Sequence, residues 1–198
     1  NPEKFWQNVS EDIFWFKKPT KILNKSKPPF YKWFEDGVTN TCYNAIDTHI
    51  DQGKGDKIAL IYDSPITNKK AKFTYEELRE KISKFAGALD NQGIRKGDRV
   101  IIYMPMIPEA VIAMLACGRI GAIHSVVFGG FASNELASRI DDSKAKILIT
   151  ASCGFEPGRT VEYRPLVDGA LKLAKHKVEK VIFFQREGNE VKLNSPLE

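Results

Sequence analysis

The residues with most potential for chemistry are glycines and an arginine that follow apolar runs. Gly129 and Gly130 come directly after such a run and just before a predicted helix, where Ser133 adds a hydroxyl. Without a Cβ, two such glycines let the backbone approach a ligand. A helix N-terminus adds free N–H groups and a positive dipole end that favour an anion. The residues alone are equally consistent with an anion-binding corner and with a plain tight turn.

A second candidate is Arg159, which ends the sequence Glu-Pro-Gly-Arg at residues 156–159. An arginine held on a Pro-Gly turn can clamp a phosphate, because its planar fork matches the phosphate oxygens. A solvated surface arginine is the simpler interpretation of Arg159 taken alone. Arg164 is a weaker candidate of the same kind.

No residue is predicted to act as a nucleophile, a general base or a metal ligand. His124 lies in the pattern of a buried strand and is expected in the core, whereas His49 and His176 are expected on helix surfaces. The three cysteines include no CxxC pair, so they indicate neither a disulfide framework nor a zinc site. This stretch is therefore expected to bind something and to leave the chemistry elsewhere.

The candidates lie in an alternation of predicted strands and helices. The predicted strands are near-continuous apolar runs at residues 58–62, 99–104, 122–128, 145–150 and 181–184. The predicted helices span residues 41–55, 74–92, 108–118, 133–140 and 165–176. Apolar runs of this kind are typical of strands buried on both faces. The fold class is therefore α/β, a mostly parallel sheet with helices on both faces, in which ligands bind beyond the carboxyl ends of the strands.

Three other segments are expected to be less regular. Residues 63–70 are predicted as a polar turn, residues 151–163 as a loop, and the tail from Arg186 as unpatterned chain. Residues 1–40 are rich in aromatics and lysine, which predicts a helical and irregular segment anchored by its aromatic side chains. Its basic residues are not interleaved with the aromatics in any motif, so we predict no nucleic-acid partner.

The net charge and the lengths of the apolar runs limit the classes of protein further. A net charge of +5 fits a solvated surface and equally a phosphate-rich ligand. No apolar run reaches the roughly 20 residues that a membrane span needs. The chain begins with Asn1, so a targeting peptide would not be visible in it.

The sequence around the predicted strand ends also resembles that of a known protein family. Residues 103–110 and 117–131 closely resemble AMP-forming short-chain acyl-CoA synthetases, the acetyl- and propionyl-CoA synthetases of the adenylate-forming superfamily. Residues 33–49 resemble the N-terminal segment of that family, and residues 97–100 resemble its Gly-Asp-Arg-Val step. The resemblance extends over residues 5–185 in ordered blocks. It implies an N-terminal segment at residues 1–55 and the first, truncated part of the AMP-binding domain at residues 56–198.

The resemblance implies a two-step ligase reaction. A short-chain carboxylate attacks the α-phosphate of ATP to give an acyl-adenylate, and the CoA thiol then displaces AMP. Mg²⁺ and backbone donors stabilise the charge that develops on phosphate. The ATP and Mg²⁺ sites, the acyl pocket and the catalytic lysine would lie beyond Glu198, so the chain alone is expected to have no ligase activity.

The resemblance also assigns residues to CoA binding. In the family, the second glycine of a Phe-Gly-Gly-Phe turn lies against CoA, a role that falls to Gly130 with Phe128 and Gly129 beside it. An Arg-Ala-Gly-Arg segment that approaches the CoA 3′-phosphate corresponds to Glu156, Pro157, Gly158 and Arg159. Glu156 replaces the first arginine, so the two-arginine clamp of the acetyl enzymes is in doubt.

The Glu-Pro-Gly-Arg variant resembles the propionate-type enzymes of animal mitochondria, the subfamily called short-chain family member 3. That resemblance favours propionate over acetate and the mitochondrial matrix over the cytoplasm. The alternative is a non-catalytic α/β module that holds a nucleotide or a partner. A nicotinamide-dependent oxidoreductase is disfavoured because the GxGxxG fingerprint is missing.

Overall fold

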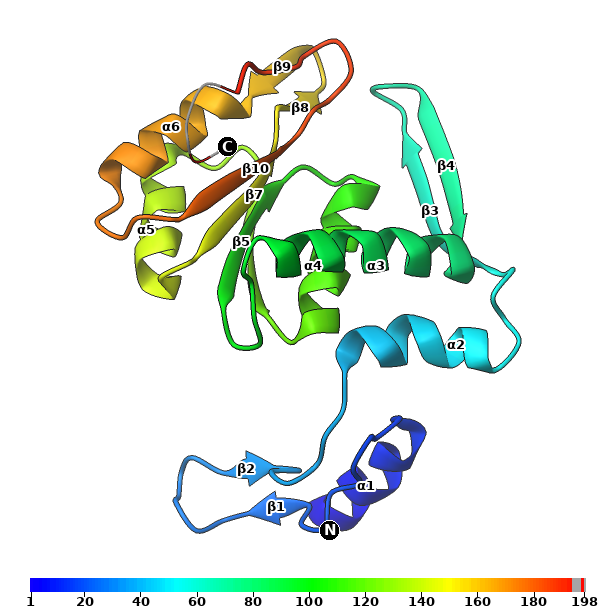
Figure 1. Cartoon of the computed structure of the whole chain (residues 1–198). Helices are drawn as coiled ribbons and strands as arrows, with labels where there is room; N and C mark the ends of the chain where they lie inside the picture. The colour runs from blue at the N-terminus through cyan, green and yellow to red at the C-terminus, as the bar shows by residue number, and fades with distance from the viewer. Residues whose placement is uncertain (194–196, 198) are drawn as a thin grey trace.

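A four-stranded parallel sheet forms the centre of the computed structural model, which describes residues 1–193 and residue 197. Its strand order is β10-β7-β5-β6, and all three pairings are parallel (Figure 1). The strands are β5 (Arg99–Met104), β6 (Ile123–Phe128), β7 (Ile147–Ala151) and β10 (Lys180–Phe184). The predicted parallel α/β sheet is confirmed. Residues 194–196 and 198 of the predicted tail lie outside the described residues.

Two pairs of helices cover the two faces of the sheet (Figure 1). They are α3 (Tyr75–Asn91) with α4 (Pro108–Ile120), and α5 (Ser133–Ser143) with α6 (Tyr163–Leu173). Helix α3 begins with the predicted capping box: the Thr74 side chain accepts from the Glu77 N–H, and the Glu77 carboxylate accepts from the Thr74 N–H. Pro108 opens α4, and Gly121, at a φ of +74°, ends it.

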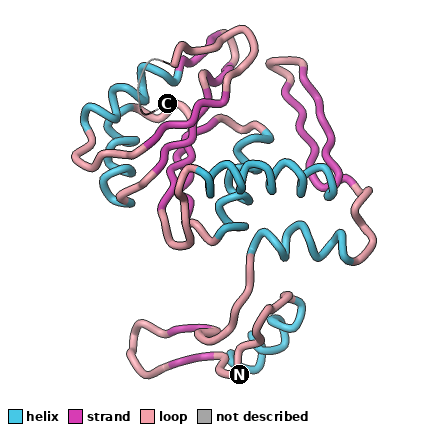
Figure 2. The backbone as a smooth tube through the Cα atoms, viewed as in Figure 1, coloured by secondary structure: helices cyan, strands magenta, loops and turns pink. Residues whose placement is uncertain are grey.

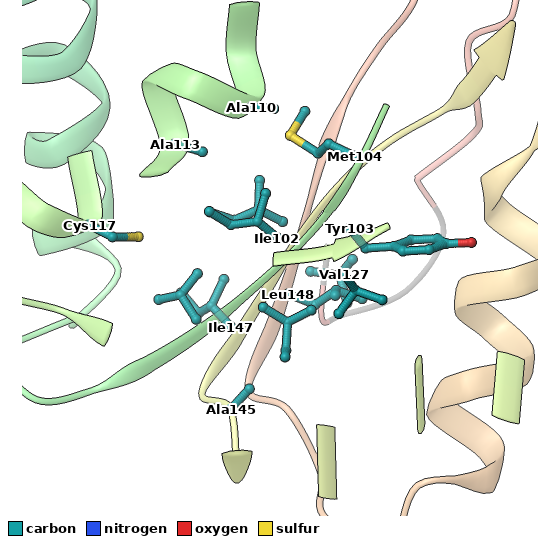
Figure 3. Packing of buried hydrophobic residues seen from close by; sticks show 14 of the residues in the cluster. Ile102, Tyr103, Met104, Ala110, Ala113, Cys117, Val127, Ala145, Ile147 and Leu148 are labelled. Carbon is teal, nitrogen blue, oxygen red and sulfur yellow. The ribbon is translucent and has the colours of Figure 1, made fainter. Parts of the chain in front are cut away.

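The core lies on both faces of β5 and β7, whose side chains are almost all buried. Ile102 points toward α4, and Tyr103 points the opposite way, toward α6 (Figure 3). Full burial of each aliphatic side chain is worth about 1.5–3 kcal/mol. This doubly covered pair of strands therefore stabilises the edge at which β5 and β7 end.

Strand β6 differs from the expectation that it is buried on both faces. It is the edge strand of the sheet in the described part of the chain, and Ile123, Val126 and Phe128 are 56%, 54% and 66% exposed. His124 is likewise exposed, so its predicted place in the core is wrong. An apolar sequence predicted a strand here, but its burial depends on neighbours that the sequence pattern does not specify.

Two segments are more ordered than expected. Residues 151–163 contain an antiparallel hairpin, β8 (Cys153–Glu156) with β9 (Arg159–Glu162), and not a loop. Strand β3 (Ile58–Ser64) pairs with β4 (Lys69–Thr74), so the turn at residues 63–70 is shorter than predicted. Figure 2 shows this hairpin standing apart from the main sheet. The second strand of this hairpin, β4, is polar and lysine-rich, so a pattern based on apolar runs does not predict the pairing.

The N-terminal segment is helical and irregular, as expected. It contains α1 (Pro2–Val9), a 3₁₀ turn η1 (Ser10–Asp12), and the short antiparallel strands β1 (Leu23–Asn24) and β2 (Lys32–Trp33). The predicted helix at residues 41–55 is a π-helical turn η2 (Tyr43–Asp47) followed by α2 (Thr48–Asp51).

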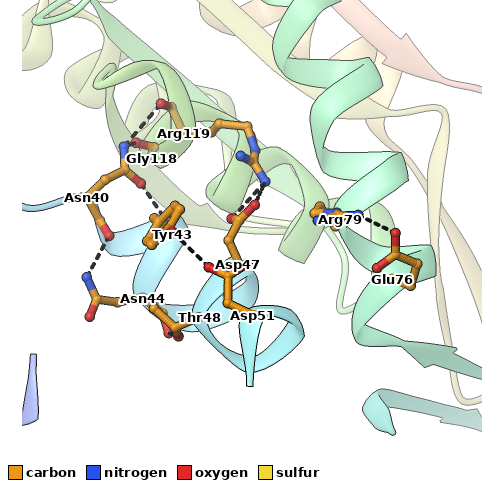
Figure 4. A network of polar contacts seen from close by, with 10 residues as sticks. All are labelled: Asn40, Tyr43, Asn44, Asp47, Thr48, Asp51, Glu76, Arg79, Gly118 and Arg119. Carbon is orange, nitrogen blue, oxygen red and sulfur yellow. Dashed lines mark hydrogen bonds and ion pairs between the residues drawn. The ribbon is translucent and has the colours of Figure 1, made fainter. Parts of the chain in front are cut away.

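A polar joint fastens this helical stretch to the end of α4 (Figure 4). An Arg119 guanidinium nitrogen lies 2.9 Å from both carboxylate oxygens of the largely buried Asp47. The Asn40 side-chain amide donates to the backbone oxygens of Gly118 and Arg119 at 2.9 and 3.1 Å. The joint sits at the opposite end of the sheet from the carboxyl edge, so it stabilises the scaffold and takes no part in the site.

Candidate functional site

Three segments meet at the carboxyl edge of the sheet: the chain after β5, the turn after β6 and the β8–β9 hairpin after β7. They enclose a cavity of about 330 Å³ together with the tip of the β3–β4 hairpin. Its lining includes Met104, Phe128, Gly129, Glu156, Tyr163 and Arg186. In parallel α/β sheets, this edge is where ligands bind.

The turn at residues 128–131 needs its two glycines for different reasons. The Phe131 N–H donates to the Phe128 carbonyl at 3.2 Å and closes the turn. Gly130 has a φ of +94°, which L side chains rarely adopt. A Cβ on Gly129 would overlap the Tyr163 hydroxyl and lie 2.8 Å from the Met104 carbonyl oxygen. Gly129 therefore permits close packing, whereas Gly130 permits the backbone conformation.

Two buried tyrosines support this turn, and sequence reasoning missed both. The Tyr103 hydroxyl accepts from the Gly130 N–H at 3.1 Å and donates to the Phe131 carbonyl at 2.7 Å. The Tyr103 and Tyr163 ring centroids are 4.9 Å apart. Burial raises the pKa of both hydroxyls, so both are protonated at neutral pH. The signal was present: a tyrosine within a buried strand usually finds a partner for its O–H.

The β8–β9 hairpin presents Glu156 and Arg159 on either side of its turn. The Arg159 Nε and Nη2 lie 2.8 and 2.7 Å from the same Glu156 carboxylate oxygen. Both side chains are partly in solvent, 71% exposed for Arg159 and 43% for Glu156. The turn between them is formed by Pro157 and Gly158, and Gly158 has a φ of +78°. Arg159 is thus held in place by an exposed ion pair.

The structure brings the predicted glycine turn and the candidate residues Glu156 and Arg159 together. The Glu156 carboxylate lies 3.8 Å from the point that a Cβ on Gly130 would occupy. The Gly130 N–H is already bonded to Tyr103, and a carboxylate faces this corner. Gly130 is therefore a poor site for a bare anion, and Arg159 is the group of this pair that can attract one.

A further cation, which sequence reasoning left in the unpatterned tail, is Arg186. Its guanidinium lies 4.4 Å from the centroid of the Phe155 ring, and its Nη1 donates to the Cys153 carbonyl at 3.4 Å. Its backbone N–H donates to the Ser152 Oγ at 2.9 Å. It lines the carboxyl-edge cavity, so the cavity has a positive group in its wall. A lone arginine after a strand carries no pattern that reveals this position.

Two other candidates serve packing. The Arg164 Nε lies 2.9–3.0 Å from the Asp168 carboxylate oxygens, and Arg164 also donates to the Lys192 carbonyl at 2.9 Å. The Ser133 hydroxyl donates to the Leu166 carbonyl at 2.8 Å and so joins α5 to α6. Neither residue lines the carboxyl-edge cavity, so we do not include Arg164 or the Ser133 hydroxyl in the candidate site.

Nothing in the described part of the chain resembles a catalytic centre. Its His, Cys, Asp and Glu side chains form no group of three that could hold a metal ion. All three cysteines are buried free thiols. A second hollow, of about 460 Å³, lies between α3, α4 and β10, but its lining is mostly apolar. No helix formed by residues 1–193 is long and apolar enough to cross a membrane.

Comparison with known proteins identifies the family. The model of the AMP-binding enzyme family matches residues 47–196, and the model of the acetyl-coenzyme A synthetase N-terminus matches residues 1–45. The chain therefore belongs to the AMP-binding enzyme family. The expected resemblance to AMP-forming acyl-CoA synthetases is confirmed.

Individual relatives agree with this assignment. The chain is 58% identical over 190 residues to the mitochondrial acyl-CoA synthetase short-chain family member 3 of Homo sapiens, covering 96% of this chain and 28% of the relative. It is 47% identical over 187 residues to the acetyl-coenzyme A synthetase of Streptomyces avermitilis, covering 94% of this chain and 28% of the relative. The solved acetoacetyl-CoA synthetase from Streptomyces lividans matches with a TM-score of 0.86 at 26% identity, covering 96% of this chain and 29% of that one. The chain thus spans less than a third of the length of these relatives.

Proposed function

We propose that this chain contributes part of the CoA site of an AMP-forming ligase. The carboxylate of a short-chain acid attacks the α-phosphate of ATP and releases pyrophosphate to give an acyl-adenylate, from which the CoA thiol then takes the acyl group and releases AMP. Propionate is the favoured substrate, with acetate as the second choice. The observation that carries the proposal is the meeting of the Gly129–Gly130 turn with the Glu156–Arg159 hairpin at the carboxyl edge of a parallel sheet.

The family resemblance suggests the roles of the residues, and their geometry is compatible with these roles. Phe128, Gly129 and Gly130 offer an exposed aromatic ring and a backbone free of Cβ atoms, against which an extended ligand can lie. Arg159 offers a guanidinium for a phosphate of CoA, and Pro157 and Gly158 hold the turn from which it projects. Glu156 is the competitor that such a phosphate must replace.

We propose that ATP and Mg²⁺ bind to residues outside the described part of the chain. The carboxylates among residues 1–193 do not gather into a metal-ligating group. Mg²⁺ would supply charge neutralisation on the transferred phosphate. The chain alone is accordingly proposed to have no ligase activity, and its partners are small molecules.

Propionate and the mitochondrial matrix are supported by similarity. Five relatives called short-chain family member 3, mitochondrial, are 55% to 59% identical to this chain. Acetyl-coenzyme A synthetases are less similar, at 47% and 48%. We favour propionate over acetate because the Glu-Pro-Gly-Arg segment resembles that of propionate-type enzymes, and the matrix over the cytoplasm because the short-chain family member 3 relatives are named mitochondrial, within short-chain fatty acid metabolism.

The test is to incubate the full-length gene product with ATP, Mg²⁺ and propionate or acetate, with and without CoA. We expect carboxylate-dependent ATP–pyrophosphate exchange without CoA, and AMP with acyl-CoA when CoA is added. The 198-residue chain alone should form neither product. A full-length protein that binds nucleotide but forms no adenylate from any short carboxylate would favour the alternative, a non-catalytic α/β binding module.

A further inference from the structure

The Tyr103 side chain bonds to two backbone groups of the turn, the Gly130 N–H and the Phe131 C=O. Its hydroxyl accepts from the Gly130 N–H at 3.1 Å and donates to the Phe131 carbonyl at 2.7 Å. Tyr103 is fully buried and lies on β5, the central strand that β6 and β7 flank. The turn is thus bonded to a fully buried side chain on an inner strand of the sheet.

We propose that Tyr103 is a positioning residue for CoA: it holds the Gly129–Gly130 backbone in the one conformation that CoA can approach. The inference rests on the proposed function, because it needs CoA to be the ligand of this turn. It assigns Tyr103 no contact with the reacting atoms. The residue acts only through the turn.

The turn needs such support because of its sequence. Two consecutive glycines have the greatest backbone freedom of any pair, so fixing them in one conformation loses the most conformational entropy. The turn's own closing bond, from the Phe131 N–H to the Phe128 carbonyl, is long at 3.2 Å. A hydrogen bond from the sheet restricts the turn before any ligand binds. The turn therefore loses less conformational entropy when a ligand binds.

The neighbouring ring keeps Tyr103 in place. The Tyr163 ring lies 4.9 Å from the Tyr103 ring, and the Tyr163 hydroxyl fills the space that a side chain on Gly129 would need. The two hydroxyls therefore have separate tasks. The Tyr103 hydroxyl bonds to the turn, whereas Tyr163 packs beneath it. This difference provides a matched pair of substitutions.

The experiment replaces each tyrosine with phenylalanine in the full-length gene product and in the 198-residue chain. In Tyr103→Phe, the Gly130 amide should exchange with solvent at least several-fold faster by NMR, and the KM for CoA should rise roughly 3- to 10-fold. ATP–pyrophosphate exchange, which needs no CoA, should stay within about twofold, because no ATP contact is lost. In Tyr163→Phe, the Gly130 amide should stay protected, because its acceptor is intact.

The ratio of acyl-CoA formation to pyrophosphate exchange in one preparation does not depend on how much of the variant is folded. An unchanged KM for CoA in Tyr103→Phe overturns the inference. An equal loss for ATP and CoA also overturns it, because that pattern marks a general structural role. A wild-type protein that makes adenylate but no acyl-CoA, or neither, overturns the proposed function itself. The two failures are therefore distinguishable.

Discussion

Replacing Arg159 with alanine should weaken CoA binding and leave adenylate formation nearly intact. Arg159 is the most exposed charged group beside the Gly129–Gly130 turn, and its guanidinium projects from the hairpin on a Pro-Gly turn. Its side chain is 71% exposed, so the substitution should not alter the fold. The change therefore reports on the ligand and on the ion pair with Glu156.

The magnitude follows from what Arg159 gains and loses. A hydrogen bond to a charged group contributes about 1.5–3 kcal/mol. To bind a phosphate, Arg159 must leave Glu156, and an exposed ion pair of this kind is worth about 0.2–1 kcal/mol. The net loss in Arg159→Ala is then about 1–2 kcal/mol, which corresponds to a rise of roughly 5- to 30-fold in the KM for CoA.

The assay compares CoA-dependent acyl transfer with CoA-independent ATP–pyrophosphate exchange in the full-length gene product. Arg139→Ala is the matched control, because it removes another exposed arginine, from α5. The control should change neither rate by more than about twofold, because exposed substitutions of this kind have small effects. Loss of pyrophosphate exchange in Arg159→Ala with an unchanged KM for CoA would refute the reasoning.

Three further predictions concern the same edge of the sheet and the core beneath it. Glu156→Gln frees Arg159 from its ion pair and should lower the KM for CoA about 2- to 5-fold. If the 3′-phosphate is the group bound, the KM for dephospho-CoA should not change. A raised KM for CoA would contradict this prediction. Gly129→Ala should lower the melting temperature by several degrees, because its Cβ would overlap the Tyr163 hydroxyl. The control Gly87→Ala should not lower it, because the new Cβ on α3 would meet open space. Equal melting temperatures of the two variants would argue against the packing described. Burial raises the pKa of the Cys117 thiol to about 12, so the thiol is neutral at pH 8. Iodoacetamide should therefore label it only when the protein unfolds. Rapid labelling of the native protein would contradict the burial of Cys117.

Strong local signals predicted most of the fold. The bounds of β5 were predicted from an unbroken apolar run, and the start of α3 from its Thr74 capping box. The β8–β9 hairpin was missed because its pairing depends on cross-strand contacts in a polar sequence. The exposure of β6 was missed because burial is a property of the neighbours of a strand and not of its own residues.

The candidate site could be predicted in part for the same reason. Glycines after a strand and an arginine on a Pro-Gly turn are local signals, so the sequence could name Gly130 and Arg159 as candidates, and their binding of CoA stays a prediction from the family resemblance. The contributions of Tyr103, Tyr163 and Arg186 arise only when three segments meet in space, and no spacing along the chain reveals them. The sequence therefore predicts where a ligand approaches better than it predicts what holds the site in shape.

The central proposal is that the turn and the hairpin form one surface for CoA. Hydrogen–deuterium exchange of the full-length gene product, read by mass spectrometry on peptides that cover residues 128–131 and 156–159, tests it most directly. We predict that CoA slows exchange in both segments together and that ATP with propionate, without CoA, does not. Protection of both segments by ATP with propionate alone, or of neither by saturating CoA, would contradict the proposal.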